Sequence, residues 1–127
     1  MTIVRRDEPD FSLTCLVCGA DAVTFRRSHV GAESPEQLVV SSLSPVTVFR
    51  PIAGPRMSDL IVLLDKGDAA AVIGHMIQTQ PVGCDAWCPT CAGVYCKEHT
   101  AIEAQWSGSW HEATYATCPL GHEREIE

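Results

Sequence analysis

Seven cysteines and five histidines give this 127-residue chain its most distinctive chemistry, because most of them occur in closely spaced pairs. The four pairs, in chain order, are Cys15-x2-Cys18, Cys88-x2-Cys91, Cys96-x2-His99 and Cys118-x3-His122. Structural zinc takes four ligands in a tetrahedron, drawn from thiolate sulfur and imidazole nitrogen. Four pairs supply eight ligands, so the sequence predicts two Zn²⁺ ions per chain.

Two pairs can share an ion in two ways. In the sequential grouping, the first two pairs bind one ion and the last two pairs bind the other. In the cross-brace grouping, pairs one and three share an ion, and so do pairs two and four. The cross-brace sites are then Cys15, Cys18, Cys96 and His99, and Cys88, Cys91, Cys118 and His122. The spacing within the pairs leaves both groupings open.

The segment from Cys91 to His99, CAGVYCKEH, resembles the C-x4-C-x2-H centre of cross-brace zinc fingers. It is similar to B-box, RING-like and stress-associated-protein fingers, in which an aromatic residue precedes the cysteine of the third pair, as Tyr95 precedes Cys96 here. The turn that carries Cys15 and Cys18 is of the kind called a zinc knuckle. Such a knuckle combined with a C-x2-H segment that opens a helix is also the treble-clef arrangement. The resemblance implies the cross-brace grouping. This chain differs from those fingers in the sixty-nine residues between its first two pairs.

Cys84 belongs to none of the four pairs. With Cys88 and Cys91 it forms a C-x3-C-x2-C spacing that also holds iron–sulfur clusters, so such a cluster is the minor alternative cofactor. A reactive thiol at Cys84 would instead suit a zinc or redox sensor. The chain is too short for the barrel of radical enzymes that use this spacing.

Two hairpins are expected to position the outermost pairs. Strands at residues 11–14 and 22–25 would flank the first knuckle, in which Gly19 supplies a positive φ. Strands at 114–117 and 123–126 would flank the last knuckle. Near the middle pairs, the sequence predicts a short strand at Val94-Tyr95 and a helix from Lys97 to Gln105.

The remaining elements lie upstream of the middle pairs. Residues 1–10 are charged and predict a loose arm. Ser58 and Asp68 are candidate N-caps for a helical hairpin at about 58–79, whose apolar face would pack in the core. Ser34 to Gln37 matches a capping box, so the next residues could form a helix or a strand. Val46 to Phe49 predicts a strand.

Together these patterns predict an α+β fold, a small zinc-stabilised treble-clef or cross-brace module with knuckle hairpins and an inserted helical hairpin. We expect one domain over residues 1–127. The zinc module would comprise residues 11–25 and 84–127, and residues 26–83 would be the insertion.

The net charge of −7 restricts the partners. Residues 58–127 contain ten acidic and three basic residues, whereas residues 1–57 are balanced. Such a surface repels phosphate, which argues against nucleic acid and favours a protein partner with a basic surface. No apolar segment is long enough to be a signal peptide or to span a membrane, so we expect a cytoplasmic protein with reduced cysteines.

The sequence contains no complete H-E-x-x-H motif, catalytic triad or phosphate-binding loop. The leading hypothesis is therefore a non-catalytic zinc domain that mediates protein–protein interaction, in which Trp106, Trp110 and Tyr115 could anchor the partner. Packing of these aromatic side chains over the knuckles is the alternative explanation. A RING-like transfer scaffold and a sensor that uses Cys84 are the alternative functions.

Overall fold

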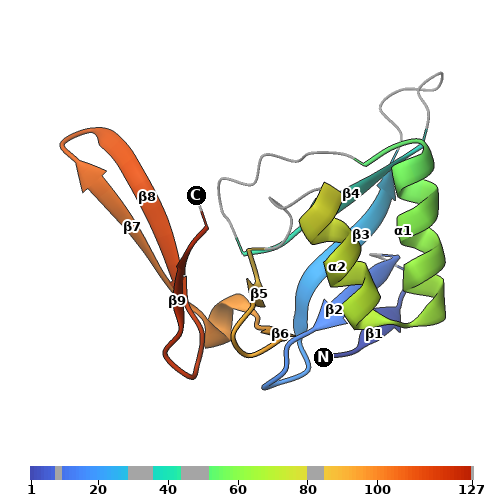
Figure 1. Ribbon diagram of the computed structural model, residues 1–127, viewed down its shortest axis with the longest axis horizontal. Coiled ribbons are helices and arrows are strands. Elements are labelled where there is room, and N and C mark those ends of the chain that lie inside the picture. The colour runs from blue at the N-terminus through green and yellow to red at the C-terminus, as the bar shows by residue number, and fades with distance from the viewer. Residues whose placement is uncertain (8–9, 29–35, 44–51, 80–84, 127) are drawn as a thin grey trace.

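The computed structural model describes residues 1–7, 10–28, 36–43, 52–79 and 85–126 (Figure 1). Within these residues the chain forms two helices and three antiparallel sheets, a mixed α/β fold. The elements are β1 Ile3–Arg5, β2 Phe11–Thr14, β3 Asp21–Ser28, β4 Gln37–Ser41, α1 Pro55–Lys66, α2 Ala69–Thr79, β5 Trp87–Cys88, β6 Gly93–Val94, the 3-10 helix η2 Lys97–His99, β7 Ala101–Ser107, β8 Trp110–Thr117 and β9 Glu123–Glu125.

The first sheet has the strand order β1-β2-β3-β4, and the two helices lie over one of its faces (Figure 1). Cross-strand register aligns Phe11 with Phe25, and Phe25 with Val40. Directly opposed residues share a face of a sheet, so these side chains form one apolar surface. The helices cover that surface with the buried side chains Leu60, Leu64, Val72 and Met76.

The predicted helical hairpin is confirmed, and its two caps have different outcomes. Asp68 caps α2, because its carboxylate accepts a hydrogen bond from the backbone N–H of Ala71 at 3.1 Å. Ser58 is not the N-cap of α1, since that helix begins earlier, at Pro55 after Gly54. Proline is favoured at the first helical position because its missing N–H has no partner there in any case.

One expectation for the N-terminal half was wrong. Ile3–Arg5 do not belong to a loose arm, because they form β1, which pairs with β2 and aligns Ile3 with Leu13. For the residues after the capping-box motif the sequence left a helix and a strand open, and the structure has the strand β4, in which alternate residues Leu38 and Val40 are buried. The strand predicted at residues 46–49 lies outside the described residues.

The helix expected from Lys97 to Gln105 is also wrong. Only the single turn η2 is helical, and β7 follows it. Every residue of β7 pairs with β8. This cross-strand pairing outweighs the intrinsic helix preference of alanine and glutamate in the segment.

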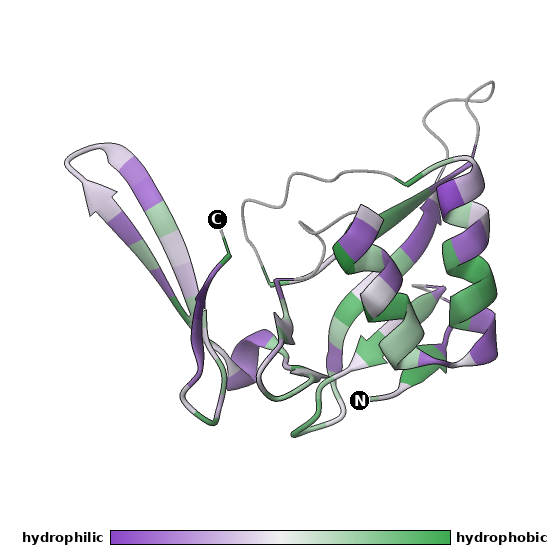
Figure 2. Cartoon of the chain, viewed as in Figure 1, coloured by the Kyte–Doolittle hydropathy of each residue, from purple (hydrophilic) through white to green (hydrophobic). Residues whose placement is uncertain are grey.

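The sheet formed by β7, β8 and β9 extends away from the helices (Figure 1). Figure 2 shows that hydrophobic residues concentrate on the first sheet and the helices, whereas β9 and much of β7 and β8 are hydrophilic. A single core cluster nevertheless contains helix residues and four of the paired cysteines: Cys15, Cys88, Cys96 and Cys118. Neither described helix is long and apolar enough to cross a membrane.

Candidate metal centres

The structure brings the eight paired residues together as two clusters of three cysteines and one histidine. In each cluster, the four candidate ligand atoms lie within 4.8 Å of one another. The clusters unite pairs one and three, and pairs two and four, so the observed grouping is the cross-brace one and not the sequential one. The first cluster is Cys15, Cys18, Cys96 and His99, and the second is Cys88, Cys91, Cys118 and His122.

The first cluster joins the turn between β2 and β3 to the two ends of η2, because Cys96 precedes that helix and His99 is its last residue. The Sγ atoms of Cys18 and Cys96 lie 3.6 Å apart. Nδ1 of His99 lies 3.3 Å from Sγ of Cys96 and 3.9 Å from Sγ of Cys15. The histidine therefore presents Nδ1 to the sulfur atoms.

The second cluster joins the end of β5 and the loop that follows it to the turn between β8 and β9. The Sγ atoms of Cys91 and Cys118 lie 3.7 Å apart. Nδ1 of His122 lies 3.1 Å from Sγ of Cys91, 3.4 Å from Sγ of Cys118 and 3.8 Å from Sγ of Cys88. Both clusters thus have the same composition and the same histidine atom facing inward.

These separations match the edges of a metal-centred tetrahedron. With metal–sulfur bonds of about 2.3 Å, two sulfur ligands of a tetrahedral ion lie about 3.8 Å apart. The observed sulfur–sulfur distances of 3.6 and 3.7 Å agree with that value. They are far longer than a disulfide bond of about 2.05 Å, and all six cysteines are free. The donor atoms therefore fit a metal ion better than a disulfide.

Backbone hydrogen bonds shape the turns that carry the cysteines. In the first knuckle, Cys15 N–H donates to the Ala20 carbonyl at 2.7 Å, and Gly19 has φ of 75°, as predicted for this turn. In the last knuckle, Cys118 N–H donates to the His122 carbonyl at 3.1 Å, and Gly121 has φ of 90°. Glycine adopts such positive φ values without the steric cost that a Cβ would impose.

One thiol in each cluster has a lowered pKa. Burial raises the pKa of Cys15, but hydrogen bonds from the backbone of Cys96, Cys18 and Val17 outweigh it and lower the pKa to about 6. Burial also raises the pKa of Cys118. Hydrogen bonds from the backbone of His122 and Leu120 outweigh this effect and lower the pKa to about 6. Thiolate is the form of cysteine that binds metal.

A second thiol in each cluster keeps its proton more strongly. Burial, followed by the neighbouring Cys18 and Cys15, raises the pKa of Cys96. At Cys91, the Tyr95 hydroxyl lowers the pKa, but burial and the adjacent thiols of the cluster raise it overall. Thiolates in such close contact repel one another, so full ionisation of a cluster requires a bound cation.

In the sequence, Tyr95 is distinguished only as the aromatic residue before the third pair. In the structure its side chain is buried and hydrogen-bonds to Cys91. This hydrogen bond, together with burial, raises the pKa of Tyr95 to about 12. The hydroxyl therefore remains a donor to the Cys91 sulfur at all ordinary pH values. Such donors to ligand atoms orient the ligands and tune metal affinity.

In the part of the chain that the structure describes, no other candidate residue belongs to either cluster. Cys84 lies outside the described residues. His75, predicted to pack rather than to bind metal, is half-buried and has the Thr79 hydroxyl 3.4 Å from Nδ1. Trp106 and Trp110 are 61% and 74% exposed, so the two indole side chains do not pack over the knuckles.

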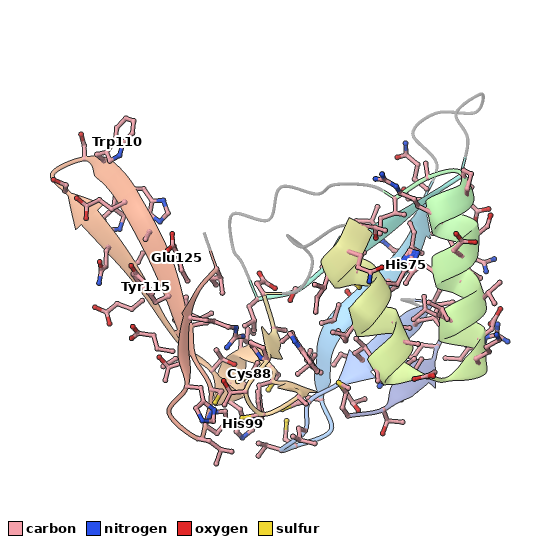
Figure 3. All side chains as sticks on the ribbon, in the orientation of Figure 1. His75, Cys88, His99, Trp110, Tyr115 and Glu125 are labelled. Carbon is pink, nitrogen blue, oxygen red and sulfur yellow. The ribbon has the colours of Figure 1, made fainter. Side chains whose placement is uncertain are left out.

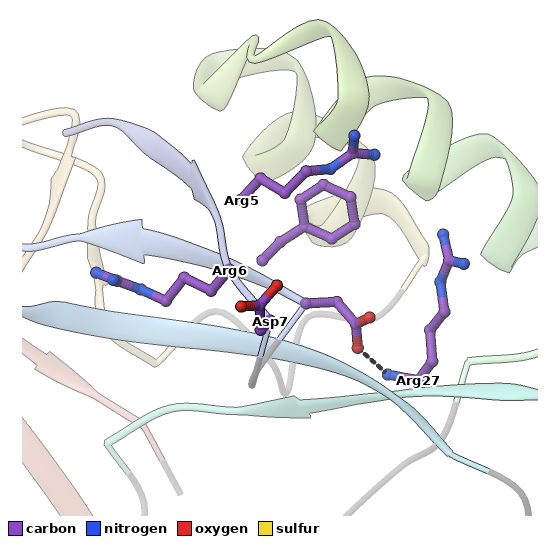
Figure 4. A pocket seen from close by; sticks show the side chains of 6 residues that line it. Arg5, Arg6, Asp7 and Arg27 are labelled. Atoms are coloured by element: carbon purple, nitrogen blue, oxygen red, sulfur yellow. Dashed lines mark hydrogen bonds between the residues drawn. The ribbon is translucent and has the colours of Figure 1, made fainter.

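A pocket beside β1 and β2 collects arginine and aspartate side chains (Figure 4). Its three arginines each form an ion pair: Arg5 with Asp65, Arg6 with Asp21, and Arg27 with Glu36. The Arg5 guanidinium also lies 5.4 Å from the centre of the Phe11 ring. Because these cations already face carboxylates, the pocket is a weaker candidate site than the two clusters.

The fold and the clusters define a mixed α/β protein with two Cys3His sites that could each hold a metal ion. Residues 5–127 match a family described as a domain of unknown function, DUF8328, and the chain belongs to that family. No curated protein and no solved structure matches the chain.

Proposed function

We propose that this chain is a non-catalytic domain that binds two structural Zn²⁺ ions and uses the surface that they organise to bind another protein. Thiolate and imidazole ligands in a tetrahedral arrangement suit Zn²⁺, whereas carboxylate-rich octahedral sites suit magnesium or calcium. Three cysteines and one histidine are a common ligand set of structural zinc.

The observation that carries the proposal is that each cluster supplies four protein ligands. A catalytic zinc site has three protein ligands and keeps the fourth position for water or substrate. Two full sets of four leave no such position, so a structural role fits better than hydrolysis or group transfer. The cross-brace grouping also fits the resemblance to treble-clef and RING-like fingers, as a scaffold without transfer chemistry.

Each site would connect segments that are far apart in the sequence. The first site would join the knuckle between β2 and β3 to η2, and the second would join the β5–β6 loop to the β8–β9 turn. The ions would therefore fix the sheet of β7, β8 and β9 against the rest of the fold. That sheet carries Trp106 and Trp110, and exposed tryptophans are frequent anchors of protein interfaces.

Metal analysis of the purified chain tests the structural part of the proposal. We expect two zinc ions per chain in the wild type, and one in each of the variants Cys18→Ser and Cys91→Ser, because each substitution removes a ligand from a different cluster. Cys84→Ser is the control and should retain two. Iron in the wild type, or loss of metal in Cys84→Ser, would contradict the proposed sites.

A further inference from the structure

Strand β7 forms an open edge of the last sheet. The strand order is β7-β8-β9, so β7 pairs with β8 on one side, and no described strand pairs with its other side. All seven of its residues, Ala101–Ser107, are exposed. Alternate residues of an edge strand direct their N–H and C=O groups away from the sheet, where an extended peptide can pair with them.

Aromatic side chains lie at the far end of this edge, next to the β7–β8 turn. Trp106 is opposite His111, and their rings meet edge to face with centroids 5.1 Å apart. Trp110 lies at the start of β8 and extends from the tip of the hairpin (Figure 3). Exposed indoles of this kind are frequent anchors of protein interfaces.

The charge of the sheet is strongly acidic. Four glutamates lie on its three strands: Glu103, Glu112, Glu123 and Glu125. Register places Glu103 opposite Tyr115, and Tyr115 opposite Glu125, so two carboxylates flank one tyrosine on the same face. The single arginine, Arg124, directs its guanidinium to the carbonyl of Asp85.

A second copy of the chain is a poor occupant of this edge. Each chain carries a formal net charge of −7, and antiparallel pairing of two β7 strands would bring two glutamate-bearing edges together. Like charges in directly opposed positions destabilise a sheet. A cationic partner has the opposite sign and gains from the same glutamates.

We propose that the outer edge of β7 binds an extended segment of a partner protein that carries lysine or arginine at alternate positions. The segment would add a fourth strand to the sheet, with its cations on the face that carries Glu103 and with its other side chains on the opposite face, which carries Trp106. This inference rests on the proposed function, since it names the partner of the same interaction surface.

Fluorescence anisotropy of labelled eight-residue peptides tests the inference on the zinc-loaded chain. The probe peptide alternates lysine and threonine. One control replaces each lysine with glutamate, and a second carries N-methyl groups on alternate backbone nitrogens. We expect the lysine peptide to bind at least about tenfold more tightly than either control, because the glutamate peptide is repelled and the methylated peptide cannot pair with an edge strand.

Three variants localise the binding. Glu103→Lys reverses the charge in the middle of β7 and should weaken binding of the lysine peptide by about tenfold. Trp106→Ala should weaken it to a smaller extent, because the indole lies on the opposite face of β7 and would contact the threonines of the peptide. The control is Asp59→Lys, the same charge reversal at an exposed position on α1, which should bind as the wild type does.

Metal content and melting temperature are measured first for every variant. They distinguish failure of the proposed zinc-binding function from failure of the inference about β7. A chain that lacks two metal ions contradicts the proposed function before any peptide is added. If the chain holds two ions but does not bind the lysine peptide, only the inference about the edge of β7 is overturned. Equal binding of the methylated peptide, or unchanged binding by Glu103→Lys, also overturns it. Sedimentation showing dimers that Trp106→Ala abolishes would assign the edge to a second copy.

Discussion

At the scale of single residues, the sulfur atoms depend on the groups that donate hydrogen bonds to them. Cys15 and Cys118 receive backbone donors, whereas Cys91 receives the hydroxyl of Tyr95. Backbone donors persist in any variant that keeps the turn. The side-chain donor at Cys91 is therefore the one that a conservative substitution can remove without changing a ligand.

Tyr95→Phe removes that hydroxyl and keeps the buried ring. We expect the affinity of the second cluster for zinc to fall by about tenfold, because hydrogen bonds to ligand atoms contribute this much in other metal sites. Affinity is measured by competition with a chromophoric zinc chelator.

Tyr115→Phe is the matched control for this measurement. Tyr115 lies on β8 and is half-buried, and it belongs to neither cluster. Tyr115→Phe also removes a hydroxyl, but it should leave the zinc affinities of both clusters unchanged. Equal loss of affinity in the two variants, or loss at the first cluster in Tyr95→Phe, would show that the Tyr95 hydroxyl has no specific role.

The eight clustered residues could be predicted from the sequence, because a tight turn places both members of a closely spaced pair on one side. The grouping of the pairs could not be derived from spacing, since it depends on which distant turns the fold brings together. It came from the resemblance around Tyr95 and Cys96. The Tyr95 hydrogen bond could not be foreseen, because it depends on where a buried side chain points.

At the scale of elements, two glycines of the helical hairpin are expected to respond oppositely to substitution by alanine. Gly74 lies within α2, is exposed and has open space where a Cβ would lie. Gly67 ends α1 with φ of 71°, and its N–H donates to the carbonyl of Leu64. We expect Gly74→Ala to raise the free energy of unfolding by about 0.5–1 kcal/mol, since glycine is a poor helix former.

The same substitution at Gly67 should have the opposite sign. Alanine at a positive φ is strained, so Gly67→Ala should lower the free energy of unfolding by about 1 kcal/mol. Urea titration of the zinc-loaded variants measures both changes. Destabilisation by Gly74→Ala would contradict the position of that glycine within a regular exposed helix.

Helices and strands differed in how well the sequence predicted them. The helical hairpin has a clear apolar face and a capping aspartate, and both signals are local. Gln37–Ser41 and Ala101–Ser107 became strands because β3 and β8 lie beside them. Such pairing depends on residues far along the chain, which local propensity does not register.

At the scale of the whole molecule, the core and the clusters hold different parts of the chain. The helices and the first sheet share a large apolar core that includes Phe25, Leu38 and Leu60. The last sheet contributes only a few small buried residues, among them Ala113 and Ala116. Its attachment therefore depends more strongly on the second cluster.

Removal of metal should loosen these parts unequally. A structural zinc ion contributes on the order of 10 kcal/mol to folding. We expect chelation to abolish hydrogen-exchange protection in β5 to β9 and to reduce it much less in α1, α2 and β1 to β4. Mass spectrometry of peptic peptides measures the protection. Readdition of zinc is the control and should restore the protection. Uniform loss of protection along the chain would contradict the stronger dependence of β5 to β9 on metal.

The interleaved order of the ligands has a consequence for how the chain acquires its metal during synthesis. Cys15 and Cys18 leave the ribosome first, and their partners Cys96 and His99 follow about eighty residues later. Cys88 and Cys91 emerge before those partners and could capture the same ion with the first knuckle. An ion taken up in this way must exchange ligands before the native grouping forms. The final pairing is then selected by the folded sheets and not by the order of translation.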